Sequence, residues 1–141
     1  MADTKTTPAG IDIRGMAPLL QVFDMPTTMA FYRDILGFTK VDANAPDDNA
    51  DFVWMRWHGI DLMFNTAYER EYRPATPDPQ RVAAHADTSI YFGCKEVDVL
   101  YEYLRAKNVQ VNPPSITGYN FKALYVKDPD EYLLVFHWPV E

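Results

Sequence analysis

The fold of this chain is decided by the stretch Gly118-Tyr119-Asn120-Phe121-Lys122-Ala123-Leu124-Tyr125-Val126-Lys127-Asp128-Pro129-Asp130-Glu131-Tyr132-Leu133-Leu134-Val135-Phe136-His137-Trp138. Aromatic and branched residues flank the turn residues Asp-Pro-Asp-Glu, and this pattern predicts a strand, a tight turn and a second strand. A similar pattern occupies Asp51–Phe64. The two stretches are displaced by 72 positions, so that Met63 corresponds to Val135. The sequence therefore predicts two related units, with a site between them formed by residues at equivalent positions.

The order of elements on either side of this stretch repeats in the same way. Asp24 is placed to cap a helix and Pro26 suits its first turn, while Gly37 is placed to end it. The expected elements of the first unit are a strand over Ala17–Phe23, a helix over Thr27–Leu36, a strand over Phe38–Val41 and a hairpin of Phe52–Trp57 with Ile60–Asn65. Those of the second are a strand over Thr88–Cys94, an amphipathic helix over Val97–Ala106, a short strand over Asn108–Val111 and the closing hairpin.

This order predicts an α+β fold made of two tandem βαβββ units in one domain. We expect a flexible N-terminal arm over residues 1–15, a first unit over 16–66, a connector over 67–87 and a second unit over 88–141. The connector is identified by its three prolines and many charged residues.

Composition restricts the classes of function. Twenty acidic against 13 basic residues give a net charge of −7, which opposes nucleic-acid binding because such a binder needs a basic face. No apolar stretch approaches the roughly 20 residues that cross a bilayer, and the N-terminus has no apolar signal core, so we expect a soluble cytoplasmic protein without a membrane partner. The single cysteine, Cys94, excludes an intrachain disulfide, and its apolar surroundings favour a buried structural thiol.

Three segments resemble the vicinal oxygen chelate superfamily, which includes glyoxalase I, extradiol dioxygenases and the fosfomycin- and bleomycin-resistance proteins. They are Val22-Phe23-Asp24 continuing to Ala30-Phe31-Tyr32-Arg33-Asp34-Ile35-Leu36-Gly37-Phe38, then Val97–Leu104, and then Val126–Leu134 with its Asp-Pro-Asp turn. The resemblance covers nearly all of the chain after residue 16. It implies that the two units form a curved mixed sheet, the two halves of a cup, and that the protein is a homodimer.

The resemblance also implies where a metal would be held. Aligned on the motifs, the family's ligand positions fall on Ala17, Met63, Ser89 and Val135. Divalent cations need His, Asp, Glu or other oxygen donors, and only Ser89 offers even a weak one. We therefore expect no metal and no cofactor.

Strand alternation adds further residues to the inner face of the cup. Alternation places Gln21, Asp61, Met63, Asn65, Tyr91 and His137 on that face. Only one of Trp54 and Trp57 can line the cup, because they alternate faces, and we expect Trp54 to do so. The resemblance to the drug groove of bleomycin-resistance proteins adds Tyr119 and Lys122. Three of them have a plainer interpretation: Asp61 could pair with Arg56, His137 could be an exposed strand-end residue, and a strand Trp usually packs structurally. His58 and His85 are expected in a turn and a loop.

The lining predicts a pocket for a small molecule, with apolar and aromatic walls and few polar anchors. The leading hypothesis is a metal-independent protein of the bleomycin-resistance type that sequesters an aromatic or cationic compound. The alternative is a metal-dependent lyase, isomerase or dioxygenase of the same superfamily, with ligands at other positions. A third interpretation, a protein-interaction module, would require an exposed apolar patch.

Overall fold

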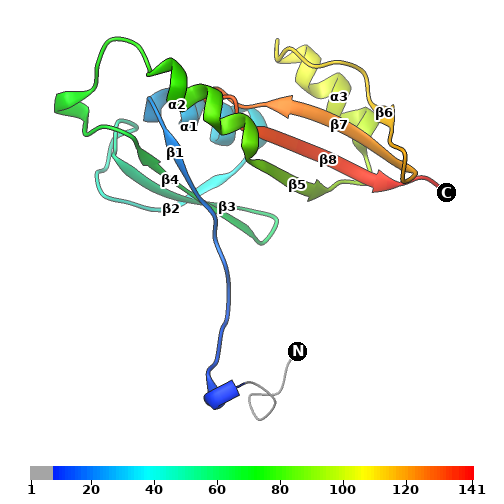
Figure 1. The fold of residues 1–141 in the computed structure, drawn as a ribbon, viewed down its shortest axis with the longest axis horizontal. Coiled ribbons are helices and arrows are strands. Elements are labelled where there is room, and N and C mark those ends of the chain that lie inside the picture. Colours follow the sequence, from blue (N-terminus) through cyan, green and yellow to red (C-terminus); the bar gives the residue numbers. More distant parts are fainter. Residues whose placement is uncertain (1–7) are drawn as a thin grey trace.

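The computed structural model describes residues 8–141 and contains two four-stranded sheets of identical topology (Figure 1). Sheet A consists of β1 (Leu19–Val22), β2 (Thr39–Ala43), β3 (Phe52–Trp57) and β4 (Ile60–Thr66), in the order β1-β4-β3-β2. Sheet B consists of β5 (Ser89–Gly93), β6 (Ser115–Ile116), β7 (Phe121–Lys127) and β8 (Leu133–Pro139), in the order β5-β8-β7-β6. In both sheets the first strand runs parallel to the last, and the other pairs are antiparallel. The predicted α+β fold of two repeated units is confirmed.

The helices between strands are α1 (Met25–Met29), η3 (Ala30–Leu36), η4 (Arg70–Tyr72), α2 (Pro79–Ala84), η5 (His85–Asp87) and α3 (Val97–Ala106). A short helix, η2 (Pro8–Gly10), precedes β1. Asp24 caps α1 as expected, since its carboxylate accepts a hydrogen bond from the Thr27 N–H at 3.2 Å. The predicted helix changes to π-helical geometry in η3, and it ends at Gly37, whose φ of 101° suits glycine.

One expectation about local structure was wrong, and one helix was not predicted. Asn108–Val111 forms no strand; β6 begins at Ser115, directly after Pro113 and Pro114, which cannot donate to a sheet ladder. The connector contains α2, whose N-cap Asp78 accepts the Gln80 N–H at 3.0 Å and whose first residue is Pro79. Local capping thus starts a short helix within a segment that is rich in proline and charged residues.

The buried faces of both sheets contribute to one continuous core. Leu62 and Phe64 of β4 and Leu134 and Phe136 of β8 are all at most 1% exposed, and they alternate with more accessible neighbours on β4. Helix α3 packs on sheet B through Val97 and Leu104, among other residues. Because one core serves both units, the faces of the two sheets that point away from it are the candidate surfaces for a site.

The Asp-Pro-Asp turn between β7 and β8 fastens the second unit to the first. Tyr32 donates its hydroxyl to Asp128 at 2.6 Å, and the N–H of Phe23 donates to Asp130 at 2.8 Å. Tyr132 completes the contact by donating its hydroxyl to the carbonyl of Gln21 at 2.8 Å. Burial raises the pKa of Asp128 to about 6, although the Tyr32 hydroxyl and backbone N–H groups oppose the shift.

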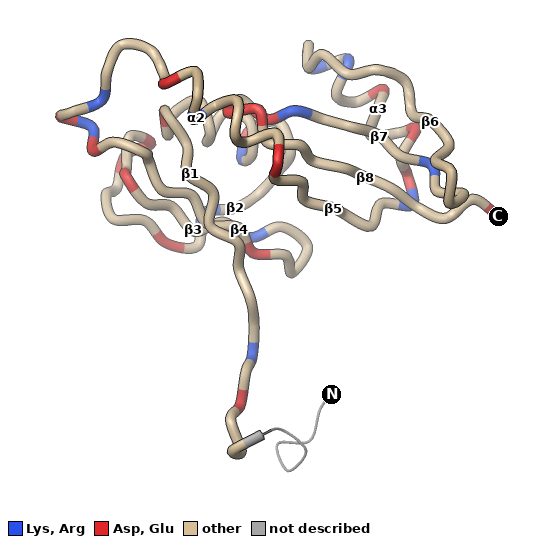
Figure 2. The backbone as a smooth tube through the Cα atoms, in the orientation of Figure 1, with Lys and Arg blue, Asp and Glu red and all other residues tan. Residues whose placement is uncertain are grey.

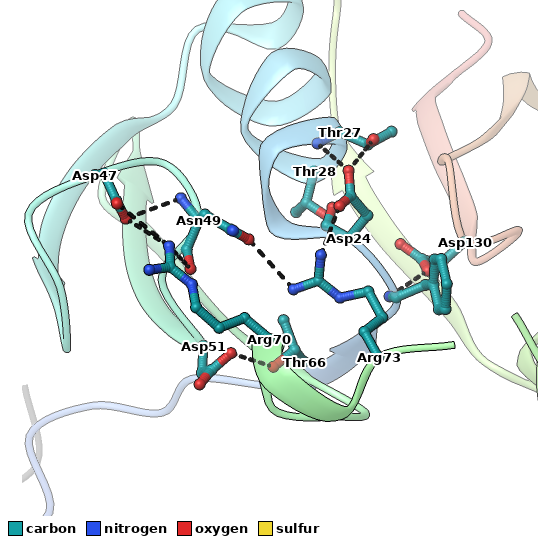
Figure 3. A network of polar contacts seen from close by, with 11 residues as sticks. Asp24, Thr27, Thr28, Asp47, Asn49, Asp51, Thr66, Arg70, Arg73 and Asp130 are labelled. Atoms are coloured by element: carbon teal, nitrogen blue, oxygen red, sulfur yellow. Dashed lines mark hydrogen bonds and ion pairs between the residues drawn. The ribbon is translucent and has the colours of Figure 1, made fainter. Parts of the chain in front are cut away.

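A second polar network fixes the connector onto the first unit (Figure 3). Arg73 donates to Asp24 at 2.9 Å and to Asn49 at 3.2 Å, and its side chain is only 14% exposed. Arg70 donates to Asp47 at 3.1 Å and to the carbonyl of Asn49 at 2.7 Å, but it is 42% exposed. The loop between β2 and β3 is therefore held by two arginines in different degrees of contact with water.

The segment that precedes β1 leaves the body of the molecule (Figure 1). Ile13 and Met16 within it are 77% and 86% exposed, so the described part of the predicted arm makes little contact with either sheet. The rest of that arm, residues 1–7, lies outside the described residues. Across the described chain, acidic and basic residues are interspersed over both units (Figure 2), and no helix there is long and apolar enough to cross a membrane.

Candidate functional site

The first candidate surface is the open face of sheet A, the face that points away from the core. The strand registers place Gln21, Asn65 and Phe52 in one row across it, and Leu19, Met63 and Trp54 in the next. Trp54, Met63, Gln21 and Asn65 are all partly buried, so neither solvent nor core fully surrounds them. Four predicted site residues thus share one face, as alternation along the strands required.

Asp61 lies at the end of the same face and already has a partner. Arg56, directly opposite on β3, donates to Asp61 at 2.7 and 3.2 Å. These bonds lower the pKa of the Asp61 carboxyl. The guanidinium of Arg56 also lies 5.7 Å from the centre of the Trp54 ring. The structure therefore shows the ion pair that sequence reasoning left open as an alternative, with the carboxylate kept ionised.

The second candidate surface is the open face of sheet B, which carries an aromatic cluster around His137. The His137 ring lies 5.1 Å from Tyr91 and 4.7 Å from Phe121, and Tyr119 lies 5.2 Å from Phe121. The Nδ1 atom of His137 is buried and has no hydrogen-bond partner among the described residues. A buried polar atom without a partner is costly, so Nδ1 marks a hydrogen-bonding position that the described chain leaves unfilled.

Lys122 is not on this face. It points to the opposite side of sheet B, where its ammonium group pairs with Asp98 of α3. The cross-strand neighbours explain the difference: Lys122 faces Trp138, whereas the neighbouring Ala123 faces His137. The resemblance to a drug groove had grouped Lys122 with Tyr119, but strand alternation separates them.

The open faces are accessible in the described chain. Leu19 of sheet A is 47% exposed, and Tyr91 and Tyr125 of sheet B are 53% and 44% exposed. An open hollow with a volume of about 910 Å³ lies beside Tyr125 and Lys127 of β7. Its lining includes Arg105, Asn108, Asn112, Tyr125 and Lys127. The size falls within the range of small-molecule sites, roughly 300–1,000 Å³.

The four positions that correspond to family metal ligands do not fit a metal. Met63 and Val135 present a thioether and an isopropyl group, Ser89 presents one hydroxyl, and Ala17 precedes β1. Within residues 8–141, no group of three His, Cys, Asp or Glu side chains is arranged to hold a metal ion. The donor set is therefore wrong for the hard divalent cations that need several oxygen or nitrogen ligands.

Sequence reasoning missed the environment of His85. Its ring stacks on Tyr132 at 4.0 Å, and its Nδ1 lies 2.7 Å from the carbonyl of Asp130. Because a carbonyl only accepts, Nδ1 carries the proton. A histidine expected in a loop is thus 9% exposed, and it belongs to the junction between the units. The only sequence signal was its position just before a strand.

The comparisons with known proteins agree with this geometry. The Glyoxalase/Bleomycin resistance protein/Dioxygenase superfamily matches residues 16–136, and the chain belongs to that superfamily. No curated protein sequence matches the chain at a significant level.

Solved structures share the fold at low sequence identity. TioX from Micromonospora sp. ML1 is 13% identical, with a TM-score of 0.70 over 90% of this chain and 99% of that one. A bleomycin resistance determinant encoded on transposon Tn5 is 19% identical, with a TM-score of 0.67 over 92% and 100%. Lactoylglutathione lyase from Agrobacterium tumefaciens is 17% identical, with a TM-score of 0.64 over 93% and 94%. These likenesses establish the fold and leave the chemistry to the residues of the open faces.

Proposed function

We propose that this protein binds a small aromatic or cationic molecule without a metal, in a cup completed by two subunits of a homodimer. The observation that carries the proposal is the aromatic cluster around His137 on an uncovered sheet face. Half-exposed Tyr91 lies beside a buried nitrogen that has no partner among the described residues. A cluster of this kind suits a ligand with an aromatic face and a group able to bond to the imidazole.

A second copy supplies what one chain lacks. Each open face is a single wall, and its half-exposed residues would become the interior of a pocket if another sheet faced them. The exposed Ile13 and Met16 of the segment before β1 offer apolar surface for the same contact. A dimer would therefore cover apolar surface and enclose the ligand in one step.

The charges and rings of the faces define the ligand class. The Trp54 ring on sheet A and the Tyr91 and Phe121 rings on sheet B provide flat surfaces for stacking. Asp61 is ionised, and the net charge of −7 favours the approach of cations. The ion pair with Arg56 limits how strongly Asp61 can attract a cationic ligand, because the ligand must share Asp61 with Arg56 or displace Arg56 from it.

The decisive experiment combines size measurement, metal analysis and ligand screening. Light scattering is expected to give a dimer, and thermal-shift assays with planar cations such as acridine orange are expected to show stabilisation. Tyr91→Ala should weaken binding at least tenfold. Tyr72→Ala should not, because Tyr72 is a 73%-exposed tyrosine of the connector. Equal binding by the two variants would contradict the assignment of the site.

The enzyme alternative is tested in the same samples. Stoichiometric zinc, manganese, iron or nickel in purified protein, or stabilisation by one of these ions, would overturn the metal-independent proposal. Asp61→Asn distinguishes the ligand classes further: it should reduce binding of planar cations and leave neutral aromatic compounds unaffected.

A further inference from the structure

A separate cavity lies at the seam between the two units, away from both open faces. Its volume is about 210 Å³. The first unit contributes the tip of the β3–β4 hairpin, and the second contributes the end of β5 and the middle of β8. The lining consists of Trp57, His58, Ile60, Phe92, Gly93, Cys94 and Phe136.

Aromatic side chains make the walls of this seam cavity rigid. Phe92 and Phe136 are stacked at 4.7 Å with an interplanar angle of 12°, and both are at most 4% exposed. The Trp57 ring crosses their edges at 6.2 and 6.4 Å. Edge-to-face and offset contacts at these distances are stabilising, so the walls are set before any ligand arrives.

The hairpin tip places a polar group beside these rings. His58 and Gly59 have φ values of 51° and 78°, the two consecutive positive angles of a tight two-residue turn. A side chain with positive φ is uncommon, and this one lies 5.1 Å from the ring of Trp57. The turn thus fixes an imidazole at the edge of an otherwise apolar space.

Cys94 contributes a thiol to the lining of the cavity. Its N–H donates to the carbonyl of His137 at 3.0 Å, which fixes the backbone there, and its side chain is partly buried. Burial raises the pKa of the thiol, so it stays protonated near neutral pH and acts as a small apolar wall group.

The seam cavity is distinct from the proposed cup because strand alternation separates them. Phe92 and Phe136 point to the core side of sheet B, whereas Tyr91 and His137 point to its open face. A molecule in one site therefore contacts none of these aromatic residues of the other.

We propose that the seam cavity binds a neutral aromatic molecule of one or two fused rings, and that this ligand bridges the two units. The size supports the class of ligand, since an apolar cavity of roughly 150 Å³ is known to hold a benzene ring. Stacked phenyl rings favour a flat guest, and His58 offers one hydrogen bond to a ring N–H or hydroxyl. Since both units supply walls, the guest stabilises their present arrangement.

Indole is a suitable probe, and Cys94 provides a specific readout because it is the only cysteine of the chain. Indole affinity would first be measured from NMR shifts of the Gly93 and Cys94 amides. At indole concentrations about ten times the dissociation constant, alkylation of Cys94 by iodoacetamide at alkaline pH should slow by about tenfold.

Two matched variants locate the site. Ile60→Trp should fill the cavity and abolish protection of Cys94, and it is tolerable because Ile60 is 39% exposed. Ile116→Trp adds the same ring at a 58%-exposed position on β6 and should leave protection intact. The proposal is overturned if saturating indole leaves the alkylation of wild-type Cys94 unchanged, if Ile60→Trp retains protection, or if indole shifts only open-face residues such as Tyr91. The wild-type measurement decides the matter even if Ile60→Trp fails to fold.

Discussion

Substitution of Asp128 by Asn is expected to change how the stability of the protein depends on pH. Asp128 is 4% exposed, and burial raises its pKa from the ordinary 3.8 to about 6. The folded state therefore binds the proton more tightly than the unfolded state between these two values. Acidification through this range stabilises the wild-type protein, and a rise in pH through it removes that stability.

The size of the effect follows from the two pKa values. The full difference corresponds to about 3 kcal/mol, at about 1.4 kcal/mol for each pKa unit. Between pH 7 and pH 5, the wild-type protein should gain about 1.3 kcal/mol relative to Asp128→Asn, which has no carboxyl to titrate. Urea unfolding followed by tryptophan fluorescence at several pH values measures this difference directly.

Tyr32→Phe provides a control, because it should strengthen the pH dependence of stability that Asp128→Asn removes. The Tyr32 hydroxyl donates to Asp128 and so lowers the carboxyl pKa. Its removal should raise that pKa further and make the stability of the protein depend more steeply on pH. A constant stability difference between wild type and Asp128→Asn from pH 7 to pH 5 would refute the reasoning. So would an NMR titration of the Asp128 carboxyl with a midpoint near 4.

Three further predictions concern stability and are checked by urea unfolding. Arg73→Met should lower the free energy of unfolding by about 2 kcal/mol, because it leaves the partly buried partners of Arg73 without their ion pair and hydrogen bond. Arg70→Met removes an exposed ion pair and should lower it by less than about 1 kcal/mol. Equal losses for the two variants would contradict the difference in burial. Leu104→Ala should cost about 2–4 kcal/mol because Leu104 is fully buried, whereas Val99→Ala, at 64% exposure on the same helix, should change stability by under about 0.5 kcal/mol. Gly37→Ala should lower the free energy of unfolding by about 1–2 kcal/mol, because alanine disfavours the φ of 101° at this position. Crowding adds nothing, since an added Cβ would lie 3.6 Å from Trp57, an ordinary contact distance. An unchanged unfolding midpoint would show that the end of the helix relaxes.

The repeated strands were predictable from sequence because each hairpin combines alternating apolar residues with an unambiguous turn. The helix over Val97–Ala106 was predicted to the residue for a similar reason, a clear apolar stripe. The connector helix α2 escaped prediction because six residues carry too short a pattern, and only Asp78 and Pro79 announced it. The strand expected over Asn108–Val111 failed because its position in the sheet depends on pairing with β7, which a local pattern does not record.

The residues of the candidate site that were predictable are those whose placement depends only on the alternation of side chains along a strand. Gln21, Met63 and Tyr91 lie on the faces that the strand pattern assigned to them. Lys122 lies on the opposite face from the one predicted, because its placement rested on a resemblance between loops and not on strand register. The ion pair of Asp61 with Arg56 lies within one hairpin, so the sequence could offer it as an alternative. The stacking of His85 on Tyr132 depends on a partner from a distant segment, which sequence spacing alone does not identify.

The contacts of the Asp-Pro-Asp turn also determine how the chain can fold. Three hydrogen bonds at this turn span 96, 107 and 111 positions of sequence. Contacts between such distant residues form only after the intervening chain has been ordered, and they slow folding accordingly. Until they form, the hydroxyl of Tyr32 and the N–H of Phe23 in the first unit lack their partners. The two units, although they repeat one topology, are therefore expected to unfold in a single cooperative transition, and neither half alone should be a stable protein.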